Sequence, residues 1–112
     1  MNNTESAYAN HLELQKRAGQ ILWYKFEGIK LRLADKTFYT PDFFVMNEQG
    51  ELECHEVKGT SRGKPFIEDD AAVKIKVAAE NFPFRFRLLW SYQREWLQKS
   101  FDDADAEKAI GA

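Results

Sequence analysis

Apolar and polar residues alternate along much of the chain, with the spacing of strands that bury one face. Lys30 and Arg32 alternate with Ile29, Leu31 and Leu33, and successive side chains of a strand point to opposite faces of a sheet. The alternation and the turn residues between apolar runs predict strands over residues 21–26, 29–33 and 84–90, and a pair of strands over residues 41–58.

Helical signals flank these strands. Thr4 is expected to cap a first helix and Gly19 to end it. A second helix is expected to open at the acidic residues 68–70, which favour a helix N-terminus, and to end at Pro83. Two further segments complete the prediction, a loop over residues 59–65 and a short helix over residues 93–101.

This order of elements predicts an α/β sandwich in which helices flank a mixed β-sheet. A chain of 112 residues suits one domain, and its three Trp, four Tyr and nine Phe supply large apolar surfaces for a core. We expect the domain to occupy residues 1–100. Residues 101–112 contain four acidic residues and one lysine and are expected to form a disordered tail.

The segment from Pro41 to Gly59 concentrates the candidate chemistry. A Glu-Gln-Gly turn at residues 48–50 predicts a hairpin, which would bring Asp42 back beside Glu56. Lys58 shares a strand face with Glu56, two residues away, while Val57 points to the other face. Two carboxylates and an ammonium would then meet at one end of an apolar sheet. Such a group can bind a divalent cation and act on a phosphodiester.

Charge and cysteine content limit the partners and the compartment. The formal charge of −2 lacks the strongly basic balance of many nucleic-acid-binding proteins. Residues 16–36 nevertheless hold six basic and two acidic residues, so a local positive surface is expected. Cys54 is the single cysteine, which favours a reducing cytoplasm. We expect no signal peptide and no membrane-spanning segment.

The pattern Pro41-Asp42, then Glu56-Val57-Lys58, resembles the core motif of the PD-(D/E)XK nuclease superfamily. The nearest similarity is to phage endonuclease I-type Holliday-junction resolvases and to related short phage and prophage proteins. It covers roughly residues 4–90, and other residues that carry it lie in the first helix and before and after the motif: Glu5, Tyr8-Ala9, Leu12, Tyr39-Thr40, Phe43 and Gly59.

The resemblance implies a restriction-endonuclease-like fold and a catalytic group of Glu5, Asp42, Glu56 and Lys58. Asp42, Glu56 and the Val57 carbonyl would bind Mg²⁺ or Mn²⁺. Lys58 would orient the attacking water or stabilise charge on the phosphate, and Glu5 would add a carboxylate from the first helix. Glu13 is a rival for that last role, but it lies off the apolar stripe of the helix.

The expected function is metal-dependent hydrolysis of DNA, at branched or Holliday-junction sites, by a homodimer in the cytoplasm of a bacterial host cell. An alternative is a nuclease-fold module with weak or no catalysis that binds DNA or a host protein. Each motif residue also has an ordinary interpretation as a turn former, a solvated side chain or a helix-dipole partner. Four basic residues after the motif are candidate DNA contacts, or ordinary solvated charges: Arg62, Lys64, Lys74 and Lys76.

Three other residues are assigned no site. His55 falls on the strand face opposite Glu56 and is expected to pack in the protein or lie at its surface. Cys54 is expected to be a small core residue. His11 has no partner that the sequence identifies.

Overall fold

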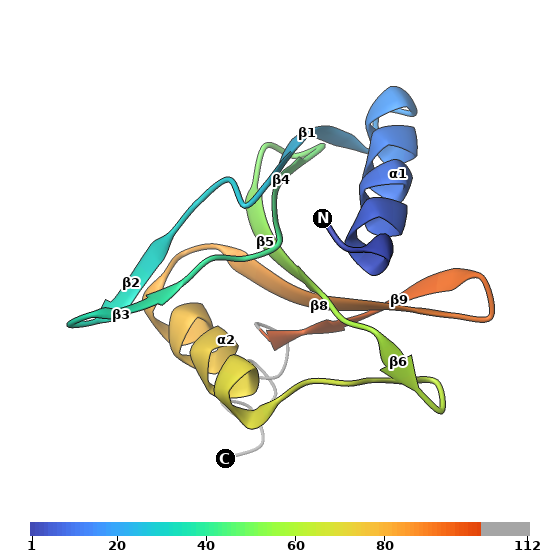
Figure 1. The fold of residues 1–112 in the computed structure, drawn as a ribbon. Coiled ribbons are helices and arrows are strands. Elements are labelled where there is room, and N and C mark those ends of the chain that lie inside the picture. Colours follow the sequence, from blue (N-terminus) through green and yellow to red (C-terminus); the bar gives the residue numbers. More distant parts are fainter. Residues whose placement is uncertain (102–112) are drawn as a thin grey trace, which may run out of the picture.

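A mixed five-stranded sheet forms the centre of the protein in the computed structural model, which describes residues 1–101 (Figure 1). The strands lie in the order β1-β4-β5-β8-β9. Their bounds are β1 Ile21–Phe26, β4 Phe43–Asn47, β5 Leu52–Val57, β8 Arg85–Tyr92 and β9 Glu95–Ser100.

Most neighbouring strands of this sheet run antiparallel, and the single parallel pair is β5 with β8. A parallel pair needs a crossover, and helix α2 (Asp69–Asn81) supplies it between the two strands. The predicted hairpin of residues 41–58 is confirmed, because Phe43 pairs with His55 and Gly50 turns the chain with a φ of 82°. The α/β class with a mixed sheet is confirmed as well.

The two helices cover opposite faces of the sheet (Figure 1). Helix α1 (Asn3–Arg17) packs Tyr8 and Leu12 against a core that includes Phe43 and Val57. Helix α2 packs against the other core, which contains Cys54. Cys54 is only 1% exposed, as expected for a small core residue. Within residues 1–101, no helix is long and apolar enough to cross a membrane.

The N-cap of α1 is Asn2, so the expectation of Thr4 is wrong. The Asn2 side chain accepts a hydrogen bond from the Glu5 N–H at 2.8 Å, and the Glu5 carboxylate accepts one from the Asn2 N–H at 2.8 Å. This reciprocal capping box satisfies two backbone donors, and the spacing Asn2-x-x-Glu5 is its sequence signature. Thr4 lies inside the first turn of the helix.

Two small hairpins extend from the sheet (Figure 1). Strands β2 (Leu31–Ala34) and β3 (Thr37–Tyr39) form an arm whose Leu31 and Tyr39 pack in the α2-side core. Strands β6 (Thr60–Ser61) and β7 (Lys64–Pro65) occupy the segment expected to be a loop. Their turn, Arg62-Gly63, has φ angles of 54° and 79°, both positive as a tight two-residue hairpin turn requires.

Residues 93–101 do not form the expected short helix. They supply β9, which pairs antiparallel with β8 through a turn at Gln93-Arg94, with φ angles of 51° and 65°. Trp96 packs against the α1-side core, so pairing with a preformed neighbour and burial of an aromatic ring outweigh local helix preference.

The described domain extends one residue beyond the expected boundary at residue 100. Phe101 is 7% exposed and belongs to the α2-side core. The expected disordered tail otherwise falls at residues 102–112, which lie outside the described residues.

The capping box gives a direct test of how α1 begins. Asn2→Ala should lower the free energy of unfolding by about 1 kcal/mol, because the Glu5 N–H loses its acceptor. Asn10→Ala, at an exposed position inside the same helix, should raise it slightly because alanine is the better helix former. Urea denaturation of both variants checks this, and equal shifts in the same direction would contradict the assigned N-cap.

Candidate functional site

The β4–β5 hairpin brings Asp42 to the end of β5. The Asp42 carboxylate, through Oδ2, accepts a hydrogen bond from the Val57 N–H at 2.8 Å. The Asp42 backbone carbonyl accepts a second bond, from the Glu27 N–H after β1, at 2.8 Å. Asp42 is therefore held from two neighbouring strands, and its carboxylate points at the Glu56-Val57-Lys58 segment.

Glu56 is a buried carboxylate, 7% exposed, with a partner on each oxygen. The Tyr39 hydroxyl donates to Oε1 at 2.8 Å, and the Lys58 ammonium lies 3.1 Å from Oε2. Burial, followed by the charge of Glu56 and its hydrogen bond, strongly raises the pKa of Tyr39, so its phenol stays protonated and keeps donating. A buried carboxylate needs such partners.

Glu5 completes the group from α1. Its carboxyl is close enough to Asp42 to raise the pKa of that residue, and one of its oxygens accepts the capping bond from Asn2. Glu13, the rival residue, is elsewhere: it accepts hydrogen bonds from Tyr24 and Arg17. The structure thus brings together Glu5, Asp42, Glu56 and Lys58 from three separate segments.

The group holds three carboxyls and one ammonium, which leaves an excess of negative charge. Burial, then the charge of Glu56, raises the pKa of Asp42 from its ordinary 3.8 to about 7, and Glu5 adds to the rise. The Val57 N–H opposes the rise without cancelling it. Near neutral pH, Asp42 is therefore held between its protonated and ionised forms, and either a proton or a cation relieves the repulsion.

The chemistry of these groups fits a hard divalent cation, because carboxylate and carbonyl oxygens are the ligands of Mg²⁺ and Mn²⁺. Their present arrangement is not a closed metal cage. Residues 1–101 contain no cluster of three or more His, Cys, Asp or Glu side chains already placed to hold an ion. The Lys58 ammonium occupies one oxygen of Glu56, so a cation binding there would have to displace it.

The four candidate DNA contacts belong to a hairpin and a helix other than the elements that carry Glu5, Asp42, Glu56 and Lys58. Arg62 and Lys64 belong to the β6–β7 hairpin, which is held to β8 where the Trp90 indole N–H donates to the Gly63 carbonyl at 3.1 Å. Lys74 and Lys76 are exposed on α2. In the described part of the chain, no hydrogen bond or ion pair engages these four side chains, which leaves their charges available to a partner.

A buried polar chain on the α1 side of the sheet was not expected from the sequence. The Tyr8 hydroxyl lies 2.6 Å from Nδ1 of His55, and Nε2 of His55 lies 2.8 Å from Oε1 of Glu53. Tyr8 and His55 are 47 residues apart, so no local spacing connects them. The available signal was the presence of two polar residues, Glu53 and His55, on a face of β5 that α1 covers.

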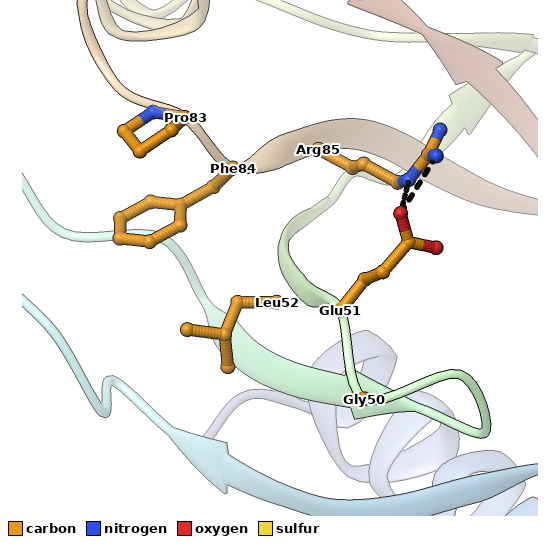
Figure 2. Close-up of a pocket in the computed structure, with 6 residues that line it drawn as sticks. All are labelled: Gly50, Glu51, Leu52, Pro83, Phe84 and Arg85. Carbon is orange, nitrogen blue, oxygen red and sulfur yellow. Dashed lines mark hydrogen bonds and ion pairs between the residues drawn. The ribbon is translucent and has the colours of Figure 1, made fainter.

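A shallow hollow of about 560 Å³ lies at the opposite end of β5 from Lys58. Figure 2 shows its wall of Leu52, Pro83 and Phe84, with the Glu51–Arg85 ion pair at one side. That pair is 2.9 Å long and well exposed. None of Glu5, Asp42, Glu56 and Lys58 lines this hollow. The candidate functional site is therefore the group around Asp42 and Glu56.

No protein-family model, curated protein or solved structure matches this chain. The resemblance of the Asp42–Lys58 motif to nucleases therefore stays a prediction, and the fold class rests on the structure itself.

The raised pKa of Asp42 predicts a pH-dependent effect on stability. The folded state holds a proton that the unfolded state releases, so stability falls as pH rises from about 4 through 7. Asp42→Asn removes the repulsion and keeps an acceptor for the Val57 N–H. It should stabilise the metal-free protein at pH 8 by roughly 1–2 kcal/mol, a figure reduced for partial solvent screening.

At pH 5 the same substitution should give little or no gain, because Asp42 is already largely protonated. Asp35→Asn is the matched control, since the Asp35 side chain is 86% exposed and should show no such pH dependence. Thermal unfolding in EDTA at both pH values measures the difference. An equal effect of Asp42→Asn at pH 5 and pH 8 would refute the shared charge at this site.

Proposed function

We propose that the protein is a metal-dependent DNA endonuclease of the PD-(D/E)XK type. The observation that carries the proposal is the convergence of Asp42, Glu56 and Lys58, with Glu5 added from α1. The order of helix, hairpin, helix and strand around them supports a restriction-endonuclease-like arrangement. A structural role would not require three carboxyls to crowd together at a cost in stability, whereas a site for a cation would.

Asp42, Glu56 and the Val57 carbonyl would hold Mg²⁺ or Mn²⁺. When bound, the cation would offset the charge of the phosphodiester and lower the pKa of water. Tyr39 keeps Glu56 in place by donating to Oε1, which leaves Oε2 as the oxygen that Lys58 can release. Glu5 would either bind the cation through its second oxygen or accept a proton from the attacking water.

Lys58 is only half-buried, with 27% of its side chain exposed, so its ammonium can leave Glu56 and approach a phosphate. Negative charge on the scissile phosphate increases in the transition state, where a fixed cation stabilises it most. In the absence of substrate, the same ammonium stabilises the buried Glu56 carboxylate. Lys58 would therefore exchange one anionic partner for another when DNA binds.

Branched DNA is the proposed substrate, and a homodimer is the proposed active form. Symmetric cleavage of a four-way junction needs two sites, and one small domain supplies one, so a C2 dimer provides the pair. The exposed Arg62, Lys64, Lys74 and Lys76 would contribute salt-dependent contacts to the phosphate backbone.

The proposal is tested by cleavage of a synthetic four-way junction. With Mg²⁺ present, the wild-type protein should nick the junction in preference to a linear duplex of the same sequence, and EDTA should stop the reaction. Glu56→Gln should abolish nicking because the cation loses a charged ligand, whereas Glu48→Gln, in the exposed β4–β5 turn, should leave it unchanged. Binding of the junction without nicking, under Mg²⁺ and Mn²⁺ alike, would instead indicate a non-catalytic DNA-binding module.

Lys58→Ala should reduce single-turnover cleavage at saturating DNA and Mg²⁺ by roughly a hundredfold, with little change in DNA affinity. The reason is that Lys58 is one phosphate contact among several in the ground state but a main source of positive charge in the transition state. Lys64→Ala and Lys74→Ala should weaken binding and reduce its salt dependence while cleavage at saturation stays near normal. A wild-type cleavage rate for Lys58→Ala would show that Lys58 only binds.

A further inference from the structure

A second, smaller pocket lies on the α1 side of the sheet. It encloses about 330 Å³ between α1, the central strands and β9. Its floor includes Glu53 and His55, whose side chains alternate with Cys54 and Glu56 along β5 and therefore point to the other face. The pocket thus lies on the face of β5 opposite to the side chain of Glu56.

The floor of this pocket is a fixed polar chain. Since the Glu53 carboxylate can only accept, Nε2 of His55 must carry the proton that it donates, and the Tyr8 hydroxyl bonds to Nδ1 on the other side of the ring. The Asn47 amide donates to the second oxygen of Glu53 at 2.9 Å. Burial would raise the pKa of Glu53, but the hydrogen bonds from His55 and Asn47 and the charges of His55 and Arg87 together lower it. A charged, oriented acceptor therefore lies at the bottom of the pocket.

The rim and walls differ from the floor. Three amide side chains line the opening, Gln15, Gln20 and Gln98, and none of them has a hydrogen-bond partner within residues 1–101. Trp96 forms one wall and meets the Tyr8 ring edge-on, with centroids 4.8 Å apart. The pocket therefore combines free amide donors and acceptors at its opening with an aromatic wall.

The charges, amide groups and aromatic wall of the pocket indicate the chemical class of its ligand. Glu53 and Arg87 both line the pocket, so an anion or a cation would face one like charge, and a neutral ligand avoids this. Amide side chains and carboxylates hydrogen-bond the edges of nucleobases, a carboxylate accepting from an amine in particular, and aromatic rings stack on their faces. A volume of about 330 Å³ is at the small end for ligand pockets, as a single base requires.

We propose that this pocket binds one unpaired nucleobase that carries an exocyclic amine, with the amine donating to Glu53 and the ring beside Trp96. The assignment of a nucleic acid as ligand rests on the proposed function. The pocket itself requires neither a metal nor catalysis, because Glu5, Asp42, Glu56 and Lys58 are not among the residues that line it. The base can come from an unpaired strand of branched DNA or from a free nucleoside.

The test uses 2′-deoxycytidine and 2′-deoxyuridine. Deoxycytidine has an exocyclic amine and an N3 acceptor where deoxyuridine has a carbonyl and an N3–H. In metal-free buffer with EDTA, deoxycytidine should saturably shift the NMR signal of the Trp96 indole N–H, and deoxyuridine should bind at least about tenfold more weakly. Glu53→Gln should remove this preference, and Gln98→Ala should weaken binding. Glu48→Gln is the control with no expected effect.

Glu53→Gln could disturb the fold because Glu53 is bonded to His55 and Asn47, so Gln98→Ala, at an exposed position, is the second variant. The affinity of a deoxycytidine oligonucleotide is then measured from the same signal. Tighter binding of the oligonucleotide than of the nucleoside would identify the ligand as a base in a strand. Tighter binding of the nucleoside would identify it as a free nucleoside. No saturable shift with deoxycytidine, equal binding of deoxyuridine, or preferential binding of N-acetylarginine amide would overturn the proposal. Base binding without junction cleavage would contradict only the proposed function.

Discussion

The antiparallel register of β4 and β5 is the constraint from which the candidate site follows. Pairing of Phe43 with His55 places the next residues, Asp42 and Glu56, side by side at the end of the hairpin. One residue of slippage would turn Glu56 to the other face of the sheet. The buried Phe43 holds the register, because slippage would remove a fully enclosed aromatic ring from the core. The packing of an apolar core thus enforces an electrostatically unfavourable contact.

Each carboxyl in this group is stabilised by a different partner. Asp42 accepts a hydrogen bond from the Val57 N–H, and Glu5 accepts one from the Asn2 N–H. Glu56 accepts one from the Tyr39 hydroxyl and pairs with the Lys58 ammonium. These partners allow the domain to fold around the group, and the charges of Glu56 and Glu5 still add to the rise that burial causes in the pKa of Asp42. Such a locally destabilised cluster is typical of a functional site, where the missing charge arrives with the ligand.

The sequence predicted the elements that depend on local signals. The hairpin has a glycine at its turn, and α2 has acidic residues at its start, so both could be found. Strand β9 could not be found from the sequence, because its turn at Gln93-Arg94 lacks the usual Asn-Gly signal. The strand also depends on pairing with β8, which the local sequence does not show. The approach of Asp42 to the end of β5 followed from the motif spacing and the hairpin register. The Tyr8–His55 bond joins residues far apart in the chain, and only the folded structure reveals it.

We propose that Asp42 shares its charge with neighbouring carboxyls in a site for a cation. The direct measurement is an NMR titration of the Asp42 side-chain carboxyl carbon, with and without Mg²⁺. The midpoint should lie near pH 7 in metal-free buffer and should move to lower pH as Mg²⁺ is added. A midpoint near the ordinary value of 3.8, or one near 7 that Mg²⁺ at millimolar concentration leaves in place, would contradict it.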